Sequence, residues 1–459
     1  MTSTITLKSE ITALGIFGGR IALSELILFS IFLTDILMLG LISELSLSAA
    51  LLVNSSFVLC FVTSLGFLQG ALPLASSHWE QRQLAAFYSV LKTSILMAAI
   101  ISALVMTGFL LYVPVLNHIG YDQQLTTEIW NYLQFIIPGL GMALVYIAVR
   151  NAVIATGNSR GFLTLALIAL ISNAGLNYAL GFGLAIGAIT TPAMGIAGIG
   201  LASSLVELFL LIGFLRLLRA TGFRVMTTVG DSTAKFWAGF REQLSKLARL
   251  GTPIGVIFFV DTTLFSGVLI IVGRHDVLGM AALALIFEWV ALAVMVPVGL
   301  SEALVQRVSR AKAAGQIKTQ LPLLVRAACI IALGYIGILA LVQFGIGINI
   351  PALFLVDPSA HPHLVQLLND FAVYGFALAA MNAFIIIIAG ILRGLLDVIT
   401  SMFIVMISYW VVGIGLTTLF MEIFDLGVSF ALLAVTIAVT LATIAIVVRL
   451  SLLLRMTRT

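Results

Sequence analysis

Twelve apolar runs, each long enough to cross a membrane as a helix, dominate this chain of 459 residues. A transmembrane helix needs about 20 consecutive apolar residues. The runs cover approximately residues 13–43, 47–75, 88–114, 126–150, 161–187, 194–218, 249–273, 278–306, 322–349, 365–392, 398–421 and 426–453. Because they have the length of helices and lack the period-two alternation of outer-membrane strands, they predict an all-α membrane protein with twelve transmembrane helices.

The scarcity of charge supports this class. Hydrophobic residues make up 61% of the chain and charged residues only 9%, whereas soluble proteins carry about 25% charged residues. The composition excludes a soluble globular protein, and no acidic or basic tail indicates a nucleic-acid partner. Cys60 and Cys329 lie in apolar runs, and the five histidines form no His-Glu-x-x-His motif. Neither a disulfide framework nor a zinc enzyme is therefore predicted.

The positions of the basic residues predict the orientation. All of the 23 Lys and Arg residues except Arg274 fall at the same ends of the predicted spans. Basic residues accumulate on the cytoplasmic side of membrane proteins. We therefore expect an even number of spans, both termini in the cytoplasm, and an integral protein of the cytoplasmic (inner) membrane that is surrounded by lipids and is monomeric.

A polar stretch after the sixth span divides the sequence. It predicts an N-lobe at 1–218, a cytoplasmic linker at 219–248 and a C-lobe at 249–459. Within 236–247, apolar residues recur at helical spacing with basic residues between them. This pattern fits an amphipathic helix on the lipid headgroups or, equally well, a solvated loop that leads into span 7.

The two predicted lobes resemble each other. At an offset of 233 residues, the segment Gly157–Gly161, which includes Arg160, aligns without gaps with Gly390–Gly394, which includes Arg393. Paired six-helix bundles related by pseudo-symmetry are a transporter architecture, with the substrate cavity between the halves.

Five acidic residues lie deep in the predicted spans: Glu25, Asp35, Glu207, Asp261 and Glu288. Each charge at membrane depth costs about 2.5–3.5 kcal/mol on insertion scales, so such residues indicate function. No Lys or Arg lies at a comparable depth in the predicted spans. The acids cannot all stay ionised in a dry interior, so some of them must be protonated, reach water or bind cations. The sequence therefore predicts a site for protons, Na⁺ or organic cations.

Polar residues at helical spacing accompany these acids in the first half. Asn173 and Asn177 share one helix face, and so do Ser203 and Glu207, because residues four apart are neighbours on a helix. Together with Asp35 they can line one pocket, and their oxygen atoms suit a hard cation. The alternative is that the Asn and Ser side chains form the helix–helix hydrogen bonds that are common in membranes.

Several motifs occur in the order found in a known transporter family. They are Phe32-Leu33-Thr34-Asp35, Gly157-Asn158-Ser159-Arg160, Asn173-Ala174-Gly175-Leu176-Asn177, Gly195-Ile196-Ala197-Gly198, Pro253-Ile254-Gly255 and, most specifically, Met295-Val296-Pro297-Val298-Gly299-Leu300-Ser301 followed by Arg307-Val308. Over nearly its whole length the chain resembles the multidrug and toxic compound extrusion (MATE) transporters of the NorM-like branch. The resemblance implies an antiporter, not an enzyme, that exports organic and often cationic compounds against Na⁺ or H⁺, with no other cofactor.

The resemblance also assigns residues. It implies an N-lobe cation site at Asp35, Asn173, Asn177 and Ser203, and a C-lobe cation or substrate site at Asp261, in which we also place Glu288 and Asn382. Glu25 and Glu207 are additional intramembrane acids. Any bound metal would be Na⁺ at Asp35 or Asp261. The chain departs from the family at Asn177, Asn382 and Arg20, where many members carry aspartate, aspartate and proline.

Two other functions stay open from the sequence. A lipid or lipid-linked oligosaccharide flippase of related fold needs a cationic cavity for phosphate groups, and the absence of deep Lys or Arg argues against it. An integral membrane enzyme needs clustered catalytic groups, whereas the histidines are spread over loops on both sides.

Overall fold

Helices make up almost all of the described part of the molecule. The computed structural model describes residues 6–186, 189–222, 233–345, 359 and 361–458. Within these ranges, twelve helical segments are long and apolar enough to cross a membrane, so the predicted number of spans is confirmed. They are Leu7–Ile42, Glu44–Glu80, Leu84–Ile119, Gln123–Ala155, Phe162–Phe182, Ile196–Ala220, Gly239–Gly273, Val277–Ala313, Ile317–Gly345, Pro362–Leu395, Val398–Ile423 and Val428–Met456.

By packing, the chain divides into two units. The first unit is residues 23–255, and the second unit combines residues 1–22 with 256–459. Both boundaries fall inside continuous helices, namely α1 (Leu7–Ile42) and α9 (Thr233–Gly273). The start of the chain therefore packs with its second half, which the division by polarity at 219–248 did not anticipate.

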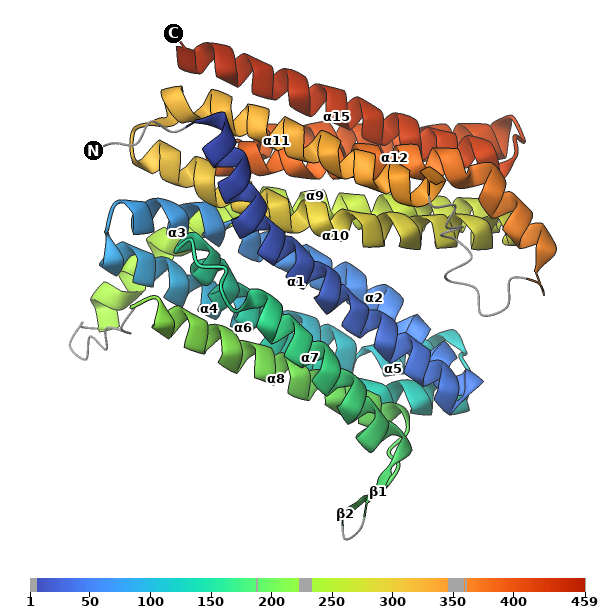
Figure 1. Cartoon of the computed structure of the whole chain (residues 1–459). Helices are drawn as coiled ribbons and strands as arrows, with labels where there is room; N and C mark the ends of the chain where they lie inside the picture. Colours follow the sequence, from blue (N-terminus) through green and yellow to red (C-terminus); the bar gives the residue numbers. More distant parts are fainter. Residues whose placement is uncertain (1–5, 187–188, 223–232, 346–358, 360, 459) are drawn as a thin grey trace. The chain divides into compact units, whose positions relative to one another are not determined.

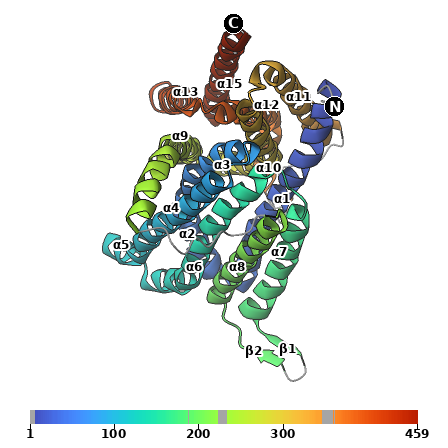
Figure 2. The same cartoon turned by 90° about the vertical axis from the view of Figure 1, so that its left-hand side faces the viewer.

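The first unit is built around one central helix, α6. After α1 it contains α2 (Glu44–Gln69), α3 (Ala71–Glu80), α4 (Leu84–Leu110), α5 (Tyr112–Ile119), α6 (Gln123–Ala155), α7 (Phe162–Leu176), the π-helix η1 (Asn177–Phe182) and α8 (Ile196–Ala220). Helix α6 packs against α8, α2 and α4, and α6 and α8 run side by side in Figure 2. The side chains of α6 are therefore the main core of this unit.

A short β-hairpin interrupts this helical pattern. Strands β1 (Leu184–Ile186) and β2 (Ile189–Thr191) pair antiparallel between η1 and α8, and they extend past the ends of α7 and α8 (Figure 1). The apolar run that was expected to continue to residue 187 thus leaves the helix after Phe182.

Glycines allow α2 and α9 to approach each other within the first unit. A Cβ atom on Gly66 would lie 2.7 Å from the Cα atom of Gly255, and one on Gly70 would lie 2.7 Å from the backbone nitrogen of Gly251. A Cβ atom on Gly251 would overlap the carbonyl oxygen of Phe67. Small residues at such crossings let helix backbones pack directly in membranes.

Helix α9 also decides between the two readings of the linker. It is continuous from Thr233 into span 7, so the solvated-loop alternative is wrong for residues 233–248. The buried side chain of Leu247 shows that the later part of this stretch already packs on the protein. Residues 223–232 of the predicted linker lie outside the described residues.

The second unit contains the remaining helices. After the first turns of α1 and the end of α9, they are α10 (Val277–Ala313), α11 (Ile317–Ala340), the π-helix η2 (Leu341–Gly345), α12 (Pro362–Leu395), α13 (Val398–Met406), the π-helix η5 (Ile407–Ile414), α14 (Gly415–Thr418), the π-helix η6 (Leu419–Ile423) and α15 (Val428–Arg458). Helix α12 packs against both α10 and α15. The first part of α1 packs on α10, where a Cβ atom on Gly18 would lie 3.0 Å from the Leu300 side chain.

The ungapped alignment of the halves fails where it seemed strongest. Gly157 and Gly161 lie in the turn after α6 with φ angles of 80° and 91°. Gly390 and Gly394, their expected counterparts, lie inside α12 and pack closely on α10. The same residue types meet different needs, since the first pair adopts a left-handed turn and the second pair permits close helix packing.

Candidate functional site

Asp35 on α1 is surrounded by neutral hydrogen-bond donors. Its Oδ1 atom accepts hydrogen bonds from Nδ2 of Asn173 at 2.9 Å and from Nδ2 of Asn177 at 2.6 Å. Its Oδ2 atom accepts a hydrogen bond from Oγ of Ser203 at 2.8 Å. The carboxylate belongs to a side chain that is only 8% exposed. The structure therefore brings together the four residues that were grouped from the sequence.

The local backbone explains how α8 reaches this carboxylate. Helix α7 ends at Leu176, and the chain continues as the wider π-helix η1, a form that often occurs at functional sites. The N–H groups of Met194 and Gly195 donate to the carbonyls of Leu180 and Gly181, at 2.9 and 3.0 Å. A side chain at Gly198 would overlap the Leu180 carbonyl. Glycine at this point therefore lets α8 pack on η1.

The site is rich in acceptors and poor in positive charge. Among the described residues, no Lys or Arg is hydrogen-bonded to Asp35. The Oδ1 atom of Asn177 is buried without a donor. The buried Tyr132 on α6 and Glu207 on α8 both lie within electrostatic reach of Asp35. Three donors offset part of the cost of burying the carboxylate, but its negative charge stays uncompensated.

Glu25 differs from Asp35 because it has a basic partner. Arg150, only 4% exposed, forms an ion pair with Glu25. The expectation that no Lys or Arg lies at the depth of the acids was wrong here. Helix α6 continues to Ala155 beyond the apolar run, so Arg150 lies inside the helix and not in a loop. Glu25 is thus part of a structural pair.

The three residues expected in the C-lobe have separate surroundings in the described part of the chain. Asp261 on α9 is half-buried and lies within electrostatic reach of Tyr409 on η5. Asn382 donates at 3.2 Å to the carbonyl of Leu378 on its own helix. Glu288 is exposed on α10. In the described part of the chain, no hydrogen bond connects Asp261, Glu288 and Asn382, which contrasts with the cluster around Asp35.

Two other sets of buried charged residues were not predicted from the sequence. Glu10 pairs with Arg307 in the second unit, and Nη2 of Arg393 donates to Oγ of Ser301 at 2.5 Å. The buried Glu302 lies within electrostatic reach of Arg393. Glu10 precedes the first apolar run, and Glu302 and Arg393 lie at the ends of apolar runs. Hydropathy alone therefore placed them outside the interior.

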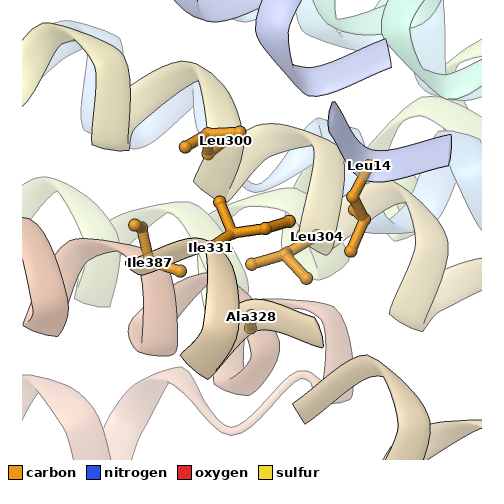
Figure 3. Close-up of a pocket in the computed structure, with 6 residues that line it drawn as sticks. All are labelled: Leu14, Leu300, Leu304, Ala328, Ile331 and Ile387. Carbon is orange, nitrogen blue, oxygen red and sulfur yellow. The ribbon is translucent and has the colours of Figure 1, made fainter. Parts of the chain in front are cut away.

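The hollows in the two units differ in character. In the first unit, Leu45 and the start of α6 surround a polar hollow of about 530 Å³, to which Gln123, Gln124, Thr127, Glu128 and Asn131 contribute. In the second unit, a gap too narrow for water lies among Leu14, Leu300, Leu304, Ala328, Ile331 and Ile387 (Figure 3). The side chains around the second gap are all apolar, so they offer no ligand to a cation.

A family model described as MatE matches residues 21–179 and 253–419, which is more than half of the chain. The chain belongs to the MatE family. This assignment agrees with the order of motifs seen in the sequence. MatE proteins are transporters, so this chain is an integral membrane transporter of the multidrug efflux family and not an enzyme.

Curated relatives and solved structures support the assignment. A probable multidrug resistance protein NorM from Agrobacterium fabrum is 26% identical over 419 residues, covering 89% of this chain and 86% of the relative. A probable multidrug resistance protein NorM from Bacillus cereus is 23% identical, and the match covers 91% of this chain and 89% of the relative. The Vibrio cholerae MATE transporter VcmN superposes with a TM-score of 0.84 at 16% identity, covering 98% of each chain. The eukaryotic MATE transporter AtDTX14 superposes with a TM-score of 0.83 at 16% identity, and the match covers 98% of this chain and 99% of AtDTX14. The last two likenesses show that this MatE chain has the same twelve-helix fold.

Proposed function

We propose that this MatE protein exports organic cations in exchange for Na⁺ or H⁺, and that Asp35 takes up the coupling ion. The observation that carries the proposal is the environment of the Asp35 carboxylate. It is buried, it accepts three hydrogen bonds from neutral donors, and no basic side chain is hydrogen-bonded to it in the described residues. Such a carboxylate is most stable when it binds a proton or a cation.

Charge neutralisation at Asp35 would couple the ion to the substrate. In an outward-open state, Asp35 would bind the ion, which removes an uncompensated charge from the interior. In an inward-open state it would release the ion and leave a negative site for a cationic substrate. Coupling requires that the ion and the substrate bind the two states with different affinities. Asn173, Asn177 and Ser203 would hold the carboxylate in place throughout the cycle.

The charges of the described residues favour this function over lipid flipping. The guanidinium group of Arg150 is paired with Glu25, and that of Arg393 donates to Ser301 and lies near Glu302. These deep arginines were not expected from the sequence, but both already have partners. A flippase for phosphate-bearing lipids would need basic groups that are available to the phosphate.

The orientation belongs to the same proposal. We infer that the protein lies in the cytoplasmic membrane with both termini in the cytoplasm, because basic residues accumulate at one set of helix ends. Reporter fusions at residue 459 and in the segment around Arg274 test this orientation. A cytoplasmic reporter signal at the C-terminus and an external signal near Arg274 are expected.

The test of function is transport by purified protein in liposomes. A Na⁺ gradient and a pH gradient are imposed separately, and the movement of one cationic dye is followed. Dye movement with one gradient, lost in Asp35→Asn, is expected and identifies the ion. Movement of a polyprenyl diphosphate without dye transport would instead favour the flippase.

A further inference from the structure

Helix α8, which brings Ser203 to Asp35, carries a second carboxylate. Glu207 lies within electrostatic reach of Asp35, and its Oε2 atom is buried without a hydrogen-bond partner. We propose that Glu207 is a direct ligand of the coupling ion, so that Asp35 and Glu207 hold it together. This inference rests on the proposed function, because it adds a residue to the same site.

The position of Glu207 on α8 supports a shared site. Ser203, whose hydroxyl donates to Oδ2 of Asp35 at 2.8 Å, lies four residues before Glu207 on the same helix. Residues four apart are about 5–6 Å from each other on a helix surface. The Glu207 side chain therefore starts one turn away from the residue that contacts Asp35, on the same face of α8.

Two buried oxygen atoms near Asp35 lack a hydrogen-bond donor, which indicates room for a proton or a cation. The Oδ1 atom of the fully buried Asn177 and the Oε2 atom of Glu207 have no donors, although Nδ2 of Asn177 donates to Asp35. Leaving a buried acceptor unpaired costs about 1–3 kcal/mol. A proton on one carboxylate, or a bound Na⁺, would satisfy oxygens of this kind, because oxygen atoms are the ligands that hard cations prefer.

In the part of the chain that the structure describes, no basic group on the helices that pack on α8 is paired with Glu207. Helix α7 carries no charged residue, and Arg150 on α6 is paired with Glu25. Of the other titratable groups on α6, Glu128 lines the hollow at its start, and Tyr146 stacks on Phe214. On η1, Tyr178 is exposed.

Among the described residues, the main charges around Asp35 and Glu207 are therefore those of these two carboxylates. Tyr132 on α6 adds a neutral phenol within electrostatic reach of Asp35. Two carboxylates within electrostatic reach of each other repel, so one proton or one shared cation between them lowers their electrostatic energy.

Glu207→Gln tests the inference, because glutamine keeps the shape and removes the charge. The probes are ²²Na⁺ binding to purified protein, proton release on addition of a cationic dye, and gradient-driven dye transport in liposomes. We expect the half-saturating concentration of the driving ion to rise at least about tenfold, which corresponds to ~1.4 kcal/mol. Glu44→Gln, which changes an exposed glutamate at the start of α2, should leave all three readouts unchanged.

A charge-swap variant separates a direct ligand from a structural residue. Asn177→Asp places a different second carboxylate next to Asp35, so the double variant with Glu207→Gln should recover the ion dependence to within about threefold. Wild-type ion dependence in Glu207→Gln overturns the inference, and so does a well-folded double variant without recovery. If Glu207→Gln unfolds, Glu207→Asp takes its place, and an unaltered ion dependence there overturns the inference as well. A wild-type protein that responds to neither gradient refutes the proposed function itself.

Discussion

Arg307 on α10 binds Glu10 on α1 through two hydrogen bonds. Nη2 donates to Oε1 at 2.6 Å, and Nε donates to Oε2 at 2.8 Å. Glu10 is only 2% exposed. The pair fixes the first turn of α1 to the second unit, and it includes the arginine that follows the most specific sequence motif.

Arg307→Lys should lower the stability of the protein. Lysine cannot form the paired bonds of a guanidinium group, so one oxygen of the buried Glu10 loses its donor. Because Arg307 is partly exposed, we expect a loss of about 1–2 kcal/mol. Thermal unfolding in detergent measures it, with Arg326→Lys, at an exposed position on α11, as the control. Equal melting temperatures of the two variants would contradict the prediction.

Asp35→Asn should abolish export while the protein still folds. Asparagine fits the same space and can still accept hydrogen bonds, but it cannot bind and release the ion as a carboxylate does. Dye efflux in cells and in liposomes is the measurement, and gel filtration verifies folding. Asp370→Asn, an exposed change on α12, serves as the control. Undiminished efflux in Asp35→Asn would remove this residue from the mechanism.

Ser203→Ala should shift the pH dependence upward if protons drive transport. The Ser203 hydroxyl stabilises the charged form of Asp35, so its removal lets the carboxyl group keep its proton to higher pH. A bond to a charged group contributes about 1.5 kcal/mol, so the pH of half-maximal transport should rise by up to about one unit. Ser48→Ala, which removes an exposed hydroxyl of α2, is the control. A downward shift would refute the argument.

Glu25→Gln should destabilise the first unit through the loss of its charge. It leaves the buried Arg150 without its acidic partner, which costs about 3 kcal/mol or more for a buried pair. Replacing Arg150 by Gln as well should recover part of the loss. A double-mutant cycle of melting temperatures measures the coupling, and additive effects would argue against a direct pair.

Gly251→Ala should prevent close packing of α2 and α9. The added methyl group would overlap the carbonyl oxygen of Phe67, so the helices must separate and lose their contact. We expect a loss of about 1–3 kcal/mol, as for other overpacked interiors. Gly239→Ala on the same helix meets nothing within 4 Å and should be tolerated. Similar expression and melting temperature for both variants would contradict this account.

The spans were predictable because the bilayer imposes one length and one polarity on every helix. The helix ends were not, since helices continue past the apolar runs into polar residues. Arg150 shows the consequence, because hydropathy placed it at the very end of the run 126–150 while α6 extends to Ala155. The β-hairpin after η1 was also missed, since its residues read as the continuation of an apolar run.

The cluster around Asp35 was predictable from spacing. Asn173 and Asn177 had to share a face of one helix, and an uncompensated acid in a span needs polar neighbours. The nearness of Tyr132 was not predictable, because it depends on the rotation of α6 about its own axis. For the same reason, two different hydrogen bonds could not be predicted. Asn382 donates to a backbone carbonyl of its own helix, whereas Asn177 donates to the Asp35 carboxylate.

The division of α1 and α9 between the two units has a mechanical consequence. The polypeptide passes from one unit to the other at residues 22–23 and 255–256, and at both places it is an unbroken helix. A continuous helix is stiffer than a loop. A rotation of either unit must therefore bend or twist these two helices. Helix α9 contains Pro253 close to its crossing, where the proline removes a backbone hydrogen bond and eases bending. Helix α1 has no proline and carries Gly18 and Gly19 before its crossing instead. The two helices that connect the units therefore differ in stiffness, because only α9 carries a proline beside the boundary.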